Sequence, residues 1–222
     1  GKPIPTELEG IYDEQKYDKQ QRYSMAQYKF STVMASINLI ISLVALGIGF
    51  YGWVDGMLRE VINNNILLSV SFLVVLNIIS SIIDIPFSYY STFKIEEDFG
   101  FNKSTKKTFW LDQLKELFIS IIINIILFGA IVAIYDLIPD YFWVLAWAIM
   151  MAFSLFMSMF YSQLIVPLFN KQTPLEEGEL RTAIENFAKS VDFNVTDIYV
   201  MDSSKRSTKA NAYFTGFGPK KR

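Results

Sequence analysis

Four long stretches without a charged residue constrain this chain more than any other feature of its sequence. Asp, Glu, Lys and Arg are all missing between Lys29 and Asp55, Glu60 and Asp84, Glu116 and Asp136, and Asp140 and Lys171. A helix needs about 20 mostly apolar residues to cross a hydrocarbon core about 30 Å thick. Each stretch is close to that length or longer. Four of them in 222 residues predict an integral membrane protein in contact with lipid.

The fold class expected from this pattern is mainly α, with polytopic transmembrane helices followed by the start of a small α+β domain. We predict an amphipathic cytoplasmic segment over 1–29, because aromatic and apolar residues alternate there with charges. Residues 30–168 are predicted to hold four transmembrane helices and a cytoplasmic loop at 88–113. The helices are placed at about 30–53, 66–87, 114–135 and 142–168.

Basic residues predict which side of the membrane the connections face. They concentrate in the segment 1–29 and in the loop 88–113, whereas Arg59 alone lies in the connections on the opposite side. The positive-inside rule therefore predicts a cytoplasmic N-terminus and a cytoplasmic C-terminal region. We expect a bacterial inner membrane rather than the endoplasmic reticulum. The net charge of −2 gives no general argument for a nucleic-acid partner.

The composition of 169–222 is that of a soluble domain. Thr173 is a candidate N-cap before Pro174, and apolar residues then recur at helical spacing through Val191. Short strands are predicted at 198–201 and 211–215. One helix and two strands in about 50 residues bury too little apolar surface for independent stability, so we expect the natural protein to continue.

The chain contains neither cysteine nor histidine. Disulfides, thiolate zinc sites, histidine-dependent catalysis and imidazole metal sites are therefore excluded within these residues. No catalytic or metal-binding residue is assigned in this chain.

Three segments together resemble the type I CAAX prenyl proteases, which are integral-membrane zinc metalloproteases. They occur in the family's order and span nearly the whole chain. They are YSTFKIEEDFGFNK at 90–103, PLFNKQTPLEEGEL at 167–180 and VMDSSKRSTKANAYFTG at 200–216.

The resemblance implies a ring of seven long helices around a water-filled chamber, closed at the cytosolic end by a gluzincin-type domain. It implies zinc held by two histidines of an HExxH helix and a downstream glutamate. The activity it implies is cleavage of peptide bonds near the C-terminus of prenylated or other membrane-associated substrates. Membrane lipid, such a substrate and the missing C-terminal half of the protein would be the partners.

The chain departs from the family pattern in having no HExxH. It therefore resembles the N-terminal half of the family, with the zinc ligands lying beyond it. The resemblance implies that the full-length protein is a zinc metalloendopeptidase and that this chain alone is inactive. Lys209 also stands where many relatives carry histidine. The alternative is a non-catalytic membrane scaffold or chamber-forming binding protein that lacks the metal site.

The third segment contains the candidate substrate-binding residues. Zincins hold a substrate as an added strand along a sheet edge, where main-chain hydrogen bonds supply affinity. We expect this role for Asn211, Ala212, Tyr213 and Phe214, against the alternative of a purely structural strand. Nearby, Lys205 and Arg206 either neutralise a substrate carboxylate or end a solvated loop.

Three asparagines form a second candidate group, within the predicted spans. Asn38, Asn77 and Asn124 each lie seven or eight residues from the cytoplasmic end of a span, roughly 10–12 Å deep. They are possible chamber-lining residues that form a polar layer facing a wet interior. Ordinary hydrogen bonding between helices is the alternative.

Overall fold

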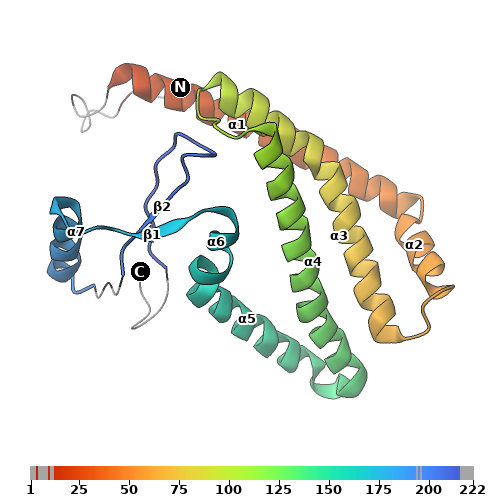
Figure 1. The fold of residues 1–222 in the computed structure, drawn as a ribbon. Helices are drawn as coiled ribbons and strands as arrows, with labels where there is room; N and C mark the ends of the chain where they lie inside the picture. Colours follow the sequence, from red (N-terminus) through yellow and green to blue (C-terminus); the bar gives the residue numbers. More distant parts are fainter. Residues whose placement is uncertain (1–3, 5–9, 11–12, 194, 196, 216–222) are drawn as a thin grey trace. The chain divides into compact units, whose positions relative to one another are not determined.

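The computed structural model of the chain describes residues 4, 10, 13–193, 195 and 197–215 (Figure 1). The chain forms two compact units, Gly1–Lys103 and Ser104–Arg222. Each unit contributes two of the four helices that are long and apolar enough to cross a membrane. Side chains in these helices are mostly uncovered, because at most 11% of the most apolar part of any of them is buried. This is the arrangement expected when lipid covers the apolar surface.

The first unit begins with a helix longer than the sequence pattern indicates. Helix α1 runs over Glu14–Gly47, and the carboxylate of Asp13 caps it by accepting a hydrogen bond from the Lys16 amide at 2.9 Å. Residues 14–29 of the predicted N-terminal segment and most of the predicted first span therefore form one helix. The span ends before Trp53, since Gly49 adopts a left-handed conformation with φ 71°. A short helix α2, Phe50–Arg59, follows and includes the last residues of the predicted first span.

Helix α3, Asn65–Tyr90, continues directly into a π-helix, η2, at Ser91–Glu96. The prediction of a loop over 88–113 is therefore wrong for most of its length, because this helix and the next, which starts at Lys106, occupy both ends of it. The helical run ends at Gly100, with φ 72°. The amide of Phe101 donates to the Glu96 carbonyl and that of Gly100 to the Glu97 carbonyl, both at 2.8 Å, which is a Schellman motif.

Gly100 should be required for this helix end. Replacing it by Ala forces a Cβ into the left-handed region at a cost of about 1–2 kcal/mol, although no steric clash occurs there. The matched control is Gly52→Ala inside α2, where a Cβ also meets open space and helix propensity improves. Thermal unfolding in detergent should show a lower midpoint for Gly100→Ala only. An unchanged midpoint would contradict the assignment of the cap.

The second unit starts with two antiparallel membrane helices. Helix α4 spans Lys106–Leu137 and α5 spans Phe142–Leu164, and the 3-10 turn η3 at Pro139–Tyr141 joins them (Figure 1). The predicted fourth span, 142–168, corresponds to a helical run that is interrupted at Ile165 and continues as α6, Val166–Phe169, with Pro167 in its first turn.

The rest of the second unit contains a two-stranded antiparallel sheet and one helix. Strand β1, Gln172–Pro174, pairs with β2, Tyr199–Met201, and helix α7 covers Glu179–Ser190. The helix and the strand near 198–201 are confirmed. Thr173 is not an N-cap, since it lies in β1 and pairs with Val200. Residues 211–215 form no strand with the part of the chain that the structure describes, in which β1 is the strand that pairs with β2.

Candidate functional site

Arg206 is the centre of a charged cluster in the second unit. Its Nε and Nη2 donate to the two carboxylate oxygens of Asp112, at 2.6 and 2.8 Å, and its Nη1 donates to Asn170 Oδ1 at 2.9 Å. The side chains of Arg206 and Asp112 are 25% and 15% exposed. Bidentate, charge-assisted bonds of this kind fix orientation as well as adding stability. The hydrogen bonds to Asp112 raise the pKa of Arg206, so the guanidinium stays charged.

The cluster joins three segments that are far apart in the sequence. Asp112 lies in the second turn of α4, Asn170 follows α6, and Arg206 follows β2. The Lys171 carbonyl also accepts a hydrogen bond from the Asp202 amide at 2.9 Å. The membrane helix α4 is therefore tied to the small sheet through side chains and backbone of the same short stretch.

A cavity of about 600 Å³ lies beside the cluster. Asp112, Glu116, Asn170 and Arg206 form its charged and polar side. Apolar side chains from α4, α5, α6 and β2 form most of the other walls: Ile119, Ile123, Ile165, Val166, Phe169 and Met201. The volume is within the range of small-molecule and peptide side-chain sites. The mixed lining suits a ligand that is apolar at one end and polar at the other.

One of the four candidate substrate residues lines this cavity. Tyr213 is one of its lining residues, and the ring of Phe214 packs edge-on against Phe193 with centroids 5.3 Å apart. Asn211 and Ala212 are exposed, and the Asn211 side-chain oxygen accepts from the Ala212 amide at 2.9 Å. These residues lie together on the segment 207–215. Their contact with a substrate is a prediction.

Both ends of the segment 207–215 are anchored. Arg206 precedes it, and the Thr215 hydroxyl donates to the Ser158 carbonyl of α5 at 3.2 Å. Of the two cations proposed for a substrate carboxylate, Arg206 is already engaged by Asp112, whereas Lys205 is exposed and pairs with Asp202 at 3.4 Å. A hydrogen bond from the Ser204 hydroxyl is the main reason that the pKa of Asp202 is lowered.

Sequence reasoning missed Asp112, the partner that explains Arg206. It lies within the segment predicted to be a loop, and 94 positions separate the two residues. The signal in the sequence was an acid near Lys115 and Glu116, a few positions before a long apolar run. That signal does not identify a partner.

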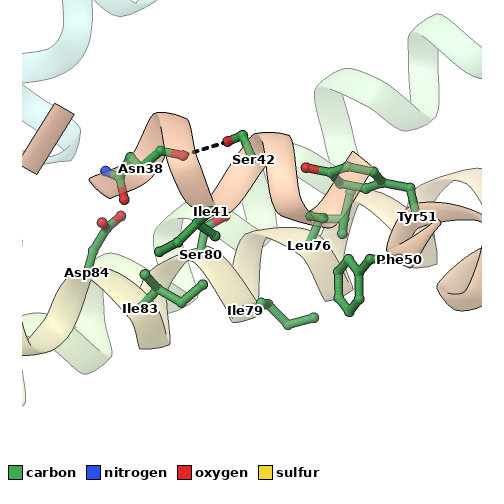
Figure 2. Close-up of a pocket in the computed structure, with 11 residues that line it drawn as sticks. Asn38, Ile41, Ser42, Phe50, Tyr51, Leu76, Ile79, Ser80, Ile83 and Asp84 are labelled. Atoms are coloured by element: carbon green, nitrogen blue, oxygen red, sulfur yellow. Dashed lines mark hydrogen bonds between the residues drawn. The ribbon is translucent and has the colours of Figure 1, made fainter. Parts of the chain in front are cut away.

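The first unit has a smaller cavity, of about 340 Å³, among α1, α2 and α3. Figure 2 shows Asn38 of α1 and Asp84 of α3 facing each other at one end, with Phe50 and Tyr51 of α2 at the other. Ser42 donates to the backbone carbonyl of Asn38 at 2.8 Å. The lining is therefore mixed, since Ser42, Tyr51 and Ser80 stand among apolar side chains, and polar groups of this kind are typical of a hydrated recess between membrane helices.

The three asparagines predicted to form a polar layer are divided between the two units. Asn38 lines the cavity in the first unit. Asn77 lies in α3, where its carbonyl accepts from the Ser81 hydroxyl at 2.9 Å. Asn124 belongs to the second unit, and its side-chain amide donates to the Ser120 carbonyl of its own helix at 2.8 Å. A chamber-lining role for the three remains a prediction.

The acidic triplet at 96–98 is structural. Glu96 accepts hydrogen bonds from the Tyr23 hydroxyl and, at 3.1 Å, from the Gln27 amide. The Tyr23 ring packs edge-on against the rings of Phe99 and Phe101, at 5.4 and 4.9 Å. These contacts fasten the first part of α1 to the end of the η2 helical run.

The residues present do not fit a zinc ion. No group of three or more His, Cys, Asp or Glu side chains within the described ranges is placed to hold a metal. The sequence also lacks the histidine and cysteine that zinc prefers. Within the described ranges, the cavity beside Arg206 therefore offers no set of zinc ligands.

The fold and the cavity define a polytopic membrane protein whose last span leads into the first elements of a small α+β domain. Residues 1–171 match the profile of the family described as CAAX prenyl protease N-terminal, five membrane helices. Residues 174–222 match peptidase family M48. The chain belongs to the CAAX prenyl protease family of M48 membrane peptidases.

Similar proteins agree with this assignment. The chain is 38% identical over 225 residues to the probable CAAX prenyl protease 1 of Schizosaccharomyces pombe, covering 96% of this chain and 48% of that protein. It is 37% identical to the Arabidopsis thaliana homologue of CAAX prenyl protease 1, covering 99% and 53%. The crystal structure of S. mikatae Ste24p superposes with a TM-score of 0.86 at 36% identity, covering 97% and 52%.

Two consequences follow from these relatives. The chain spans about half the length of the curated relatives it matches. Those relatives are eukaryotic and lend no support to the expectation of a bacterial membrane. Membership of the family and the four membrane-spanning helices confirm the resemblance inferred from the sequence and the integral membrane location.

Proposed function

We propose that these residues form the membrane and substrate-holding part of a zinc metalloendopeptidase that cleaves near the C-terminus of prenylated or other membrane-associated substrates. The zinc ligands would come from outside this chain, as would the catalytic groups. Taken alone, the 222 residues would be inactive. The boundaries at 30–168 for the membrane part and 169–222 for the start of the peptidase domain belong to the same proposal.

One observation carries the proposal. The segment holding Asn211–Phe214 leaves a rigid anchor at Arg206 and borders an amphipathic cavity of about 600 Å³ formed with membrane helices α4 and α5. A substrate anchored in lipid brings an apolar group and a polypeptide to the same place. A cavity with apolar walls and a polar side accommodates both.

This chain's residues would bind and orient the substrate. Residues 211–214 lie exposed and form no strand with other described residues, so their backbone can pair with an extended peptide. Tyr213 would bound the apolar part of the cavity. With the N-terminus and the peptidase domain on the cytoplasmic side, as the basic residues predict, the peptide would approach from the cytosol.

The decisive experiment uses the natural full-length protein purified in detergent. We expect about one bound zinc per molecule and cleavage of a farnesylated CAAX peptide that is lost with a chelator and restored by zinc. A protein without zinc, or cleavage that resists chelation, would reject the peptidase. Peptide binding without cleavage in a zinc-free protein would support the alternative, a chamber-forming binding protein.

A further inference from the structure

We propose that Arg206 is a positioning residue that sets the place of the substrate-holding segment 207–215 against membrane helix α4. The inference rests on the proposed function, since it concerns the same segment. It assigns to Arg206 an indirect role, through Asp112 and Asn170, and no contact with the reacting groups.

The geometry favours positioning over simple stabilisation. Arg206 makes three hydrogen bonds, two to Asp112 and one to Asn170. A partly buried ion pair contributes little net stability, because desolvation opposes the attraction between the charges. What the bidentate fork supplies is a fixed orientation, which lysine cannot reproduce with its single ammonium group.

The anchor lies at the right place in the chain to act on the substrate residues. Asn211 comes five positions after Arg206, and Tyr213 lines the same cavity as Arg206 and Asp112. Beyond them the Thr215 hydroxyl bonds to Ser158 of α5. The segment is therefore held at one end by α4 and at the other by α5, and its middle part is exposed.

Arg206 also ties the segment to the start of the sheet. Asn170 is followed by Lys171, and β1 begins at the next residue, Gln172. The Lys171 carbonyl accepts a hydrogen bond from the Asp202 amide at 2.9 Å. A shift of α4 would thus be transmitted through Asp112 to Arg206 and on to the segment 207–215. This arrangement couples the position of the substrate-holding segment 207–215 to that of membrane helix α4.

The test compares Arg206→Lys with Arg181→Lys in the natural full-length protein. Arg181 is a matched control, because its side chain is 24% exposed, pairs with Glu185 at 2.9 Å and donates to the Leu175 carbonyl at 2.8 Å. Both replacements keep the charge. We expect Arg206→Lys to raise KM for a farnesylated peptide about fivefold with kcat within about twofold, and Arg181→Lys to change neither. Equal losses in the two variants would overturn the inference.

A double-mutant cycle with Asn211→Ala separates positioning from general damage. If Arg206 acts through the segment, the double variant should lose scarcely more than the worse single variant, since both changes disable the same substrate contacts. If the losses in kcat/KM simply multiply, Arg206 acts elsewhere and the inference fails.

Amide hydrogen exchange decides the structural half without any activity. Arg206→Lys should speed exchange over 207–215 about fivefold or more, whereas Arg181→Lys should leave that segment unchanged. Unchanged exchange in Arg206→Lys would overturn the anchor itself. A wild-type protein that never cleaves peptide would reject the proposed function, and the exchange result would still show whether Arg206 holds the segment.

Discussion

Asp112→Ala should lower the free energy of unfolding by about 2–3 kcal/mol, the largest loss expected from any single truncation considered for this chain. The replacement leaves the Arg206 guanidinium, 25% exposed, without the carboxylate that accepts two of its hydrogen bonds. Removing one partner of a buried pair costs about 3–5 kcal/mol, and an exposed pair less than about 1 kcal/mol. Partial burial places this pair between the two.

The measurement is unfolding in mixed micelles, with two companion variants. Asp112→Ala combined with Arg206→Met should recover most of the lost stability, because the guanidinium left without its carboxylate is then also removed. Asp202→Ala, which breaks the exposed pair with Lys205, should leave the free energy of unfolding unchanged within error. A double variant as unstable as Asp112→Ala would show that the loss comes from packing around Asp112 and not from the stranded guanidinium.

The membrane helices were predictable because one physical constraint dominates them. A bilayer admits few charges in its core, so the gaps between charged residues mark the spans directly. All four predicted spans correspond to long helices. The family was also predictable, since the segments at 90–103, 167–180 and 200–216 carry their pattern in the linear sequence.

The ends of the helices are poorly predicted by composition, because charged residues are frequent both in loops and in the solvent-exposed turns of helices. In the stretch 88–100 the charged side chains form ion pairs and hydrogen bonds while the backbone stays helical. Lys94 pairs with Asp98 one turn away, at 3.1 Å, and Glu96 is bound by Tyr23 from another helix. Local composition does not reveal such partners.

The parts of the candidate site that depend on contacts between residues far apart in the chain could not be predicted from the sequence. The strand pattern at 211–215 located this segment but did not reveal what lies beside it. In the structure, β2 pairs with residues 172–174. The same applies to Arg206, whose basic side chain looks like that of exposed Lys205 until the position of Asp112 is known. Which residues meet is decided by the fold of α4, α5 and the sheet together.

The second large effect is expected inside the membrane, at Leu127 of α4. Leu127 is 8% exposed, whereas its neighbour Ile126 is 66% exposed. Lipid tails are as apolar as these side chains, so association of helices in a bilayer depends on packing and not on transfer from water. Leu127→Ala should therefore cost about 2 kcal/mol through the cavity it leaves, and Ile126→Ala should cost close to nothing because lipid fills the space.

The pair of variants distinguishes a packed helix face from a lipid-facing one at adjacent positions of one helix. Both replacements remove apolar atoms, and the helix propensities of Leu and Ile differ little from each other. Unfolding in mixed micelles measures the loss for each. Equal losses would mean that Ile126 is also covered by protein in the natural molecule, and that the face of α4 opposite Leu127 meets another helix instead of lipid.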